Sequence, residues 1–161
     1  MGDGVGTDIV SVPRIEALVR VRGHAFLRRW FTPGEIAYCT AKAVPGRHLA
    51  ARLAAKEAVV KALPVPWDGP LPWRSIEIVH RADGGPQVRL HGDVLAAGRR
   101  AGVVDVRVSL SHCDGYATAV ALVTTAPGGT APGGAAPGNG DERDAGAGNR
   151  SAGDEGDDGG P

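Results

Sequence analysis

The alternation of hydrophobic and polar residues predicts strands at both ends of the first 125 residues, with helices between them. Residues 104–111 alternate strictly, with three valines and Leu110 on one face and polar side chains on the other. Helical spacing of apolar residues instead marks the segment that begins at Pro13. The predicted strands are 5–10, 75–81, 87–91, 104–111 and 116–123, and the predicted helices begin at Pro13 and span 32–43, 47–63 and 93–101. This order indicates an α+β fold.

Short capping and turn signals fix several of these boundaries. Ser11 is a candidate N-cap, and Thr32-Pro33-Gly34-Glu35 has the spacing of a capping box with proline at the first helical position. Pro64-Val65-Pro66 ends the helix over 47–63. Gly4 and Gly6 leave room for another backbone to approach the first strand closely.

Composition changes sharply after Thr125. Residues 126–161 are rich in Gly, Ala, Pro and acidic residues and contain no Leu, Ile, Val or aromatic side chain. Such a segment buries too little apolar surface to offset its ordering entropy, so we expect a domain over 1–125 and a disordered tail over 126–161.

The formal net charge of zero hides an asymmetry between these two parts. Seven acidic side chains and two arginines lie in the tail, so residues 1–125 carry 16 basic and 11 acidic side chains. A modestly basic domain suits an anionic ligand or an acidic protein partner, although ordinary surface charge explains this excess equally well.

The two cysteines and the absence of targeting signals favour a cytoplasmic protein. Cys39 and Cys113 have no metal-type spacing, no secretory segment opens the chain, and no apolar stretch is long enough to cross a membrane. Cys113 follows His112, but neighbours in sequence do not form a catalytic pair, so we disfavour a cysteine nucleophile. Nucleic-acid binding is also disfavoured, because the arginines are scattered and aromatic residues are few.

Two charged side chains in the helix over 47–63 could serve phosphate chemistry. Glu57 and Lys61 are four residues apart, which places them on one helix face, one turn apart. The same spacing is common in surface ion pairs, so it does not decide the matter alone. Asp8, near the end of the first strand, and His112, at the turn after 104–111, could complete a site.

Together these residues fit the requirements of phosphoryl transfer. Two carboxylates bind Mg²⁺ only if substrate phosphates and water complete its octahedral shell, and a nearby Lys or His neutralises phosphate charge. Simpler roles remain open, because Asp8 could cap the following turn and His112 could be a turn residue. Lys56 is expected to point away from Glu57 and Lys61 into solvent.

Three segments resemble the holo-[acyl-carrier-protein] synthase family of 4′-phosphopantetheinyl transferases. They are GVGTDIV over 4–10 followed by Arg14, RLAAKEAxxKA over 52–62, and VSLSHxxxYAxA over 108–119. Their order and spacing match over most of residues 4–123, and the tail lies outside the resemblance. The resemblance implies helices packed on a small antiparallel sheet. It also implies Mg²⁺-dependent transfer of the phosphopantetheine arm of coenzyme A to a serine of an apo acyl, polyketide or peptidyl carrier protein, with release of 3′,5′-ADP.

The resemblance also implies a role for individual residues. Small members of the family are homotrimers with each active site built between two subunits. Because the serine nucleophile would come from the carrier, this chain needs a base, and Glu57 or a metal-bound water near Asp8 could serve. We favour the water, since a metal ion lowers the basicity of a ligating Glu57. The implied roles are Mg²⁺ ligation by Asp8 and Glu57, contact of Lys61 with the reacting phosphate, coenzyme A binding by Arg52, Ser109, Ser111 and His112, and carrier binding by Arg14, Arg20 and Arg22.

The chain departs from the family after the helix over 47–63. Family members commonly continue with a Gly-Thr-Gly turn, whereas this chain has Pro64-Val65-Pro66. Proline removes amide donors that glycine would offer to a nucleotide. The alternative hypothesis is therefore a relative that binds coenzyme A or a carrier protein without transfer.

Overall fold

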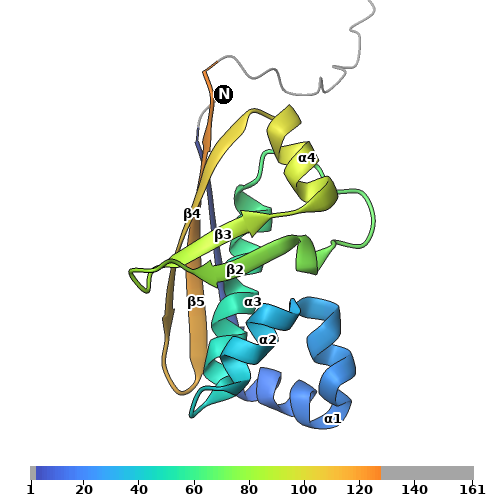
Figure 1. Ribbon diagram of the computed structural model, residues 1–161, viewed down its shortest axis with the longest axis vertical. Helices are drawn as coiled ribbons and strands as arrows, with labels where there is room; N and C mark the ends of the chain where they lie inside the picture. The colour runs from blue at the N-terminus through green and yellow to red at the C-terminus, as the bar shows by residue number, and fades with distance from the viewer. Residues whose placement is uncertain (1–2, 128–161) are drawn as a thin grey trace, which may run out of the picture.

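A long helix, α3 (Pro45–Ala62), packs against a three-stranded antiparallel sheet in the computed structural model, which describes residues 3–127. The other elements are β1 (Gly4–Ser11), α1 (Val12–Trp30), α2 (Pro33–Thr40), the short 3₁₀ helix η1 (Trp73–Ser75), β2 (Ile76–His80), β3 (Pro86–Leu90), α4 (Gly92–Arg100), β4 (Val103–His112) and β5 (Tyr116–Thr125). The sheet has the order β1-β5-β4, and a separate β2-β3 hairpin crosses in front of α3 (Figure 1).

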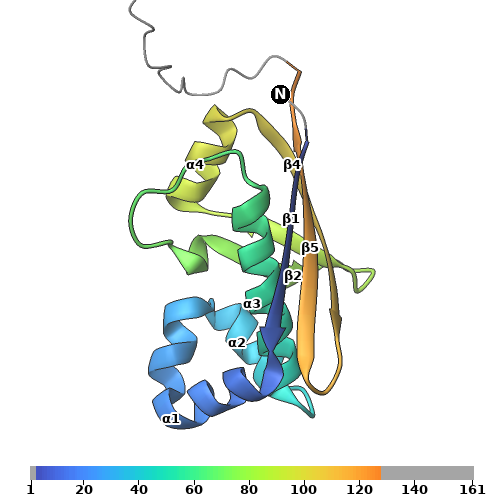
Figure 2. The same ribbon diagram turned by 180° about the vertical axis from the view of Figure 1, so that it is seen from behind.

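Strands from the two ends of the described chain pair with each other. β1 runs antiparallel to β5 along its whole length, and Asp8 lies opposite Ala119. Seen from behind, β1, β5 and β4 form one surface, while α1 and α2 lie together at the far end of α3 (Figure 2). The predicted α+β fold is confirmed, with its strands divided between two sheets.

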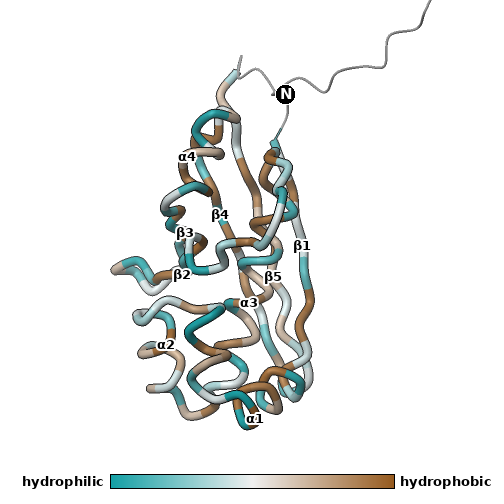
Figure 3. Tube along the Cα trace, turned by 90° about the vertical axis from the view of Figure 1, so that its right-hand side faces the viewer, coloured by the Kyte–Doolittle hydropathy of each residue, from teal (hydrophilic) through white to brown (hydrophobic). Residues whose placement is uncertain are grey.

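Small side chains allow α3 to lie close to the sheet. β5 turns Ala117, Ala119, Ala121 and Val123 inward, and α3 is itself rich in buried alanine. Hydrophobic and hydrophilic segments alternate along the trace, as expected for elements with one buried face (Figure 3). The core forms one cluster under α1 and α2, including Phe31, and another between α3, the two sheets and α4, including Ile78.

Two glycines of β1 are required by this close packing. A Cβ atom on Gly4 would lie 2.0 Å from the carbonyl oxygen of Ala62, and one on Gly6 would lie 2.0 Å from that of Ala58. Any side chain there would push β1 away from α3. The close backbone approach predicted from the sequence is thus confirmed, and it brings Asp8 to α3.

Local signals predicted the helix starts better than their ends. Ser11 accepts a hydrogen bond from the Arg14 amide, and Thr32 and Glu35 form the complete capping box. α2 ends at Thr40, earlier than predicted. α1 continues to Trp30 across a kink at Gly23, where φ is +53°.

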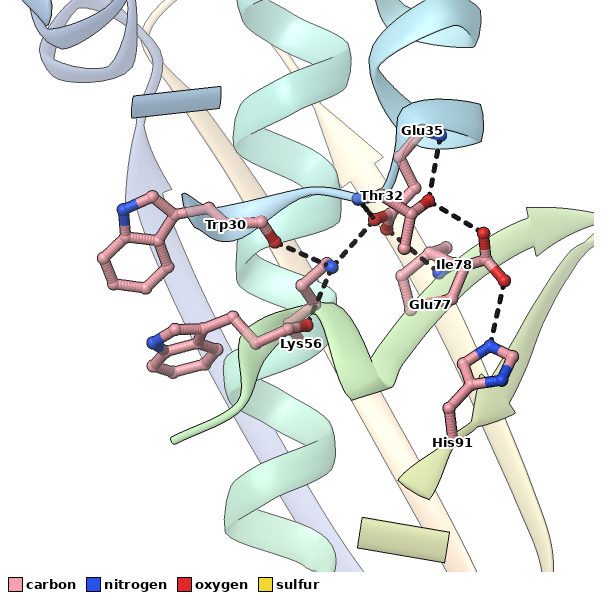
Figure 4. Close-up of polar contacts among 8 residues, drawn as sticks. Trp30, Thr32, Glu35, Lys56, Glu77, Ile78 and His91 are labelled. Carbon is pink, nitrogen blue, oxygen red and sulfur yellow. Dashed lines mark hydrogen bonds and ion pairs between the residues drawn. The ribbon is translucent and has the colours of Figure 1, made fainter. Parts of the chain in front are cut away.

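The prediction for Lys56 is wrong. Its side chain is fully buried, and its ammonium group forms an ion pair with Glu35 in the centre of the protein (Figure 4). The sequence pattern placed it correctly on a different face from Glu57, but that face meets α2 and η1 rather than solvent. Burial lowers the pKa of Lys56, and the Glu35 carboxylate opposes this shift.

Two further expectations concern chain ends and membranes. The tail predicted over 126–161 lies, from residue 128 onward, outside the described residues. Within residues 3–127, no helix has both the length and the hydrophobicity needed to cross a bilayer.

Candidate active site

β1 and α3 bring three of the predicted site residues together. Lys61 Nζ donates hydrogen bonds to Asp8 Oδ1 at 2.7 Å and to the Thr7 carbonyl oxygen at 3.1 Å. Glu57 lies one turn earlier on the same face of α3 and interacts with both Asp8 and Lys61. Spacing alone suggests an ion pair between Glu57 and Lys61. In the structure Lys61 instead forms its ion pair with Asp8, which links α3 to β1.

The charges of this group favour an added cation. Burial raises the pKa of the Glu57 carboxyl, and the neighbouring carboxyl of Asp8 raises it further. The hydrogen bond to Asp8 raises the pKa of Lys61. A metal ion beside Glu57 and Asp8 would offset the repulsion that disfavours the charged form of Glu57.

The donor set fits Mg²⁺ with open coordination positions. Among residues 3–127 there is no group of three or more His, Cys, Asp or Glu side chains that could hold a metal ion. Asp8 and Glu57 therefore supply two carboxylates at most, and phosphate oxygens and water must supply the rest. Mg²⁺ is commonly bound in this way, by one or two carboxylates and substrate phosphates.

An apolar cavity opens beside these carboxylates. It has a volume of about 380 Å³ and extends from Asp8 and Glu57 past Arg14 to Phe26 and Trp30. Arg14 lines this cavity and is exposed, and its positive charge partly opposes the rise in the pKa of Glu57. Phe26 and Trp30 therefore give the cavity apolar walls next to Asp8 and Glu57.

The same apolar lining continues along α1. A second hollow of about 690 Å³ shares Leu18, Phe26 and Trp30 with the first and is bordered by Arg22 and Arg29. Arg20 is exposed on α1 but lines neither hollow. Phe26, Trp30 and Arg29 were missed in the sequence, because the kink at Gly23 interrupts the helical pattern that would have placed them beside Leu18.

A second group of charged residues surrounds Tyr38 and is called the cationic cluster. The Arg52 guanidinium lies 4.1 Å and the Lys42 ammonium 4.3 Å from the centre of the Tyr38 ring. His80 stacks on this ring at 4.2 Å, and the rings of His48 and His112 are 5.2 Å apart. The cationic cluster consists of Lys42, His48, Arg52, His80 and His112.

Arg52 indicates that this cluster binds an anion. It is only 4% exposed, yet no acidic side chain within residues 3–127 forms a salt bridge with it. In the same part of the chain its Nε atom has no hydrogen-bond partner, and one terminal nitrogen lies 3.3 Å from His80 Nδ1. Buried charges are normally paired, so an anionic ligand is the expected partner.

Ser109 and Ser111 do not join this cluster. They are exposed and lie opposite Val120 and Thr118, on the face of the sheet that points away from α3. His112 lies opposite the buried Ala117 and is directed to the other face, near His48. Lys42, His48 and His80 had no sequence signal, because they come from three separate elements.

The residues on either side of the segment that replaces the glycine turn pack against the core, whereas Pro64 and Val65 are half-buried and Pro66 is exposed. Leu63 and Trp67, on either side of Pro64-Val65-Pro66, pack against the cluster that contains Ile76 and Val94. The Trp67 indole nitrogen also donates to the Pro70 carbonyl oxygen at 3.4 Å. This segment is therefore held by apolar contacts.

Acidification is expected to destabilise the ligand-free protein through this cluster. Burial lowers the pKa of His48 and His80, and neighbouring cations lower both further. The unfolded chain then binds more protons, so the free energy of unfolding decreases as pH falls from about 6.5 through the lower folded pKa values. We expect a melting temperature a few degrees lower at acid than at neutral pH, and partial recovery with inorganic phosphate. The melting temperature of a His48→Gln/His80→Gln variant should fall less on acidification than that of the wild type. An equal fall in both proteins would contradict this explanation.

Comparison with known proteins gives consistent matches along the described chain. The family model of the 4′-phosphopantetheinyl transferase superfamily matches residues 4–121. A holo-[acyl-carrier-protein] synthase of Moorella thermoacetica is 47% identical over 121 residues, covering 75% of this chain and 93% of that protein. The Helicobacter pylori holo-[acyl-carrier-protein] synthase in complex with coenzyme A is 32% identical, with a TM-score of 0.65 and coverage of 74% of this chain and 99% of that one. The corresponding Neisseria meningitidis structure is 35% identical, with a TM-score of 0.67 and coverage of 76% and 98%. These matches include every element that carries the site.

Proposed function

This chain belongs to the 4′-phosphopantetheinyl transferase superfamily, and we propose that it moves the phosphopantetheine group of coenzyme A to a serine of an apo carrier protein, with Mg²⁺, releasing 3′,5′-ADP. The resemblance inferred from three motifs is confirmed, and the chain is a phosphopantetheinyl transferase by its relatives. The observation that carries the proposal is the convergence of Asp8, Glu57 and Lys61 on the β1–α3 contact.

Each residue of this group has a role in the proposed transfer. The carrier serine oxygen forms a bond to the phosphorus that bears pantetheine, and the pyrophosphate bond to the departing nucleotide breaks. A water held near Asp8, or Glu57 itself, accepts the serine proton. Asp8 and Glu57 would hold Mg²⁺, which neutralises pyrophosphate charge when bound. Lys61 holds the reacting phosphate and stabilises the charge that develops on the departing nucleotide.

The cationic cluster is proposed to hold a phosphate of coenzyme A. The unpaired charge of Arg52 supports this, as does the coenzyme A complex of the Helicobacter pylori relative. Arg52 and Glu57 are five residues apart on α3, so they lie on different sides of the helix. One protomer therefore does not present both groups to the same side, which supports an active site shared between two subunits.

The exposed face of the β1-β5-β4 sheet is the proposed contact between subunits of a homotrimer. Val5, Ile9 and Val120 are 67%, 65% and 47% exposed on this face, together with Tyr116 at 56%. An apolar surface of this kind commonly marks a protein interface. It also carries Ser109 and Ser111, which would then meet a ligand held by a neighbouring subunit.

An Ile9→Glu replacement is expected to convert the trimer to monomers and to abolish transfer, because it places a charge in an apolar interface. Sedimentation velocity measures the change. Val21→Glu is the matched control, since Val21 is 79% exposed on α1, away from the sheet, and should leave a trimer. A monomeric wild type, or a trimeric Ile9→Glu variant, would contradict the proposed assembly.

The apo carrier protein, of the acyl, polyketide or peptidyl kind, is proposed to dock on α1. Leu18, Phe26 and Trp30 supply a hydrophobic floor, and Arg14 and Arg22 border it. This arrangement suits an acidic carrier with a few apolar side chains. Arg20 would add positive charge at the edge of the same surface. We place the protein in the cytoplasm, where such carriers are used.

The experiment that separates transfer from binding follows coenzyme A directly. The protein is incubated with Mg²⁺, coenzyme A and a panel of apo carriers, and nucleotides are separated by chromatography. Release of 3′,5′-ADP that requires a carrier supports the transferase. Binding of coenzyme A by calorimetry without any 3′,5′-ADP release would instead support the alternative of a binding protein.

A further inference from the structure

Lys56 uses its full hydrogen-bonding capacity inside the protein. Its Nζ donates to Glu35 Oε2 at 2.8 Å, to the Trp30 carbonyl oxygen at 2.9 Å and to the Trp73 carbonyl oxygen at 3.0 Å (Figure 4). An ammonium group has three donors, and all three are satisfied. The side chain therefore ties α3 to the end of α1 and to η1 at a single point.

Glu35 extends this connection to two more elements. Its Oε2 atom also accepts the Thr32 amide at 2.8 Å, and its Oε1 atom accepts the Ile78 amide of β2 at 3.0 Å. Thr32 donates in turn to Glu77, which contacts His91. The buried ion pair is thus the centre of a network that joins α1, α2, α3, η1 and β2 (Figure 4).

Much of the buried surface of helix α3 consists of small side chains, with Leu49, Leu53 and Val59 as its larger apolar contacts. Its buried surface includes six alanines, and alanine provides no large side chain to interlock with a neighbouring element. Lys56 makes its three hydrogen bonds in the middle of this surface of mostly small side chains. Buried polar pairs contribute little stability compared with apolar residues, but they can select one arrangement among several of similar energy.

The rotation of α3 decides where Glu57 points. Successive helical residues are turned by about 100°, so Lys56 faces α2 and η1 while Glu57 faces β1 and Asp8. A helix held at Lys56 consequently holds Glu57 at a fixed angle to Asp8. We propose that Lys56 is a positioning residue, whose ion pair with Glu35 keeps Glu57 facing Asp8 so that both carboxylates can bind one divalent cation.

This proposal rests on the proposed Mg²⁺ role of Asp8 and Glu57, and its test needs no turnover. A Glu35→Gln/Lys56→Met variant removes both charges with little change of shape. Binding of Mn²⁺, a paramagnetic substitute for Mg²⁺, is measured by electron paramagnetic resonance in the presence of coenzyme A. We expect at least about tenfold weaker Mn²⁺ binding, as is usual when a supporting contact behind a metal ligand is lost.

A matched control separates positioning from general destabilisation. Val94→Ala creates a cavity in the core near α4, away from the ion pair, and lowers the melting temperature without touching the rotation of α3. It should bind Mn²⁺ like the wild type. Equal Mn²⁺ affinity in the folded double variant and the wild type would overturn the positioning role.

Two further outcomes are decisive. If the double variant does not fold, Glu35→Gln alone replaces it, since glutamine can still accept from the Ile78 amide. Several-fold weaker Mn²⁺ binding by this variant supports the proposal, and unchanged binding overturns it. A wild type that binds no Mn²⁺ would overturn both the positioning role and the proposed function. Equal Mn²⁺ affinity of variant and wild type would overturn the positioning role alone.

Discussion

Replacing Glu57 with alanine is expected to lower kcat/KM for carrier modification by about 10³-fold, because it removes one of the two protein ligands proposed for Mg²⁺. The substitution also removes the partner that raises the pKa of Lys61 alongside Asp8. Initial rates of holo-carrier formation, measured over a range of Mg²⁺ concentrations, give the result. The loss should persist at high Mg²⁺, since the missing ligand also orients the pyrophosphate.

The control for this variant is an exposed acid outside the site. Asp93 lies in the first turn of α4, outside the site, so Asp93→Asn should transfer at the wild-type rate. Near-full activity of Glu57→Ala would contradict the assignment of Glu57 as a metal ligand. Comparable losses in both variants would show that the effect is not specific to the β1–α3 contact.

Replacing Lys61 with methionine is expected to lower kcat by about 10²-fold, the cost typical of losing one charged group that stabilises a transition state. The Lys61 side chain is 54% exposed, so its removal should leave the fold intact. Methionine keeps most of the length of the side chain and lacks its charge. Single-turnover rates at saturating coenzyme A measure the chemical step directly.

Lys42 provides the matched comparison. It belongs to the cationic cluster and lies 4.3 Å from the centre of the Tyr38 ring, apart from Asp8 and Glu57. Lys42→Met should therefore raise KM for coenzyme A while changing kcat little. If Lys61→Met also changed only KM, Lys61 would be a binding residue rather than a group that stabilises the leaving phosphate.

The residues that sequence predicted best are those with a local reason for their position. Ser11 and Thr32 are capping residues, and their hydrogen bonds lie within a few positions along the chain. Gly4 and Gly6 were also predictable, because only a close backbone approach explains two glycines in so short a strand. Glu57 and Lys61 were found from their spacing on one helix and Asp8 from its place at a strand end, and the three motifs that resemble one family supported all three.

The residues that sequence missed depend on contacts between distant segments. Lys56 was expected in solvent because lysine is rarely buried, and only the three-dimensional structure brings Glu35 and two carbonyl groups to meet it. His48 of α3 and His80 of β2 meet the ring of Tyr38 from α2, with no spacing that could reveal them. Contacts between segments far apart in the sequence determine the surroundings of these side chains. The periodicity of the sequence predicts only the helices and strands.

The most direct test of the central claim is the intact mass of an apo carrier protein after incubation with this protein, coenzyme A and Mg²⁺. The proposed function predicts that one carrier gains the mass of a single phosphopantetheine group, that its reactive serine bears it, and that EDTA or Glu57→Ala prevents the gain. A carrier whose mass stays unchanged across acyl, polyketide and peptidyl types, with coenzyme A demonstrably bound, would contradict it.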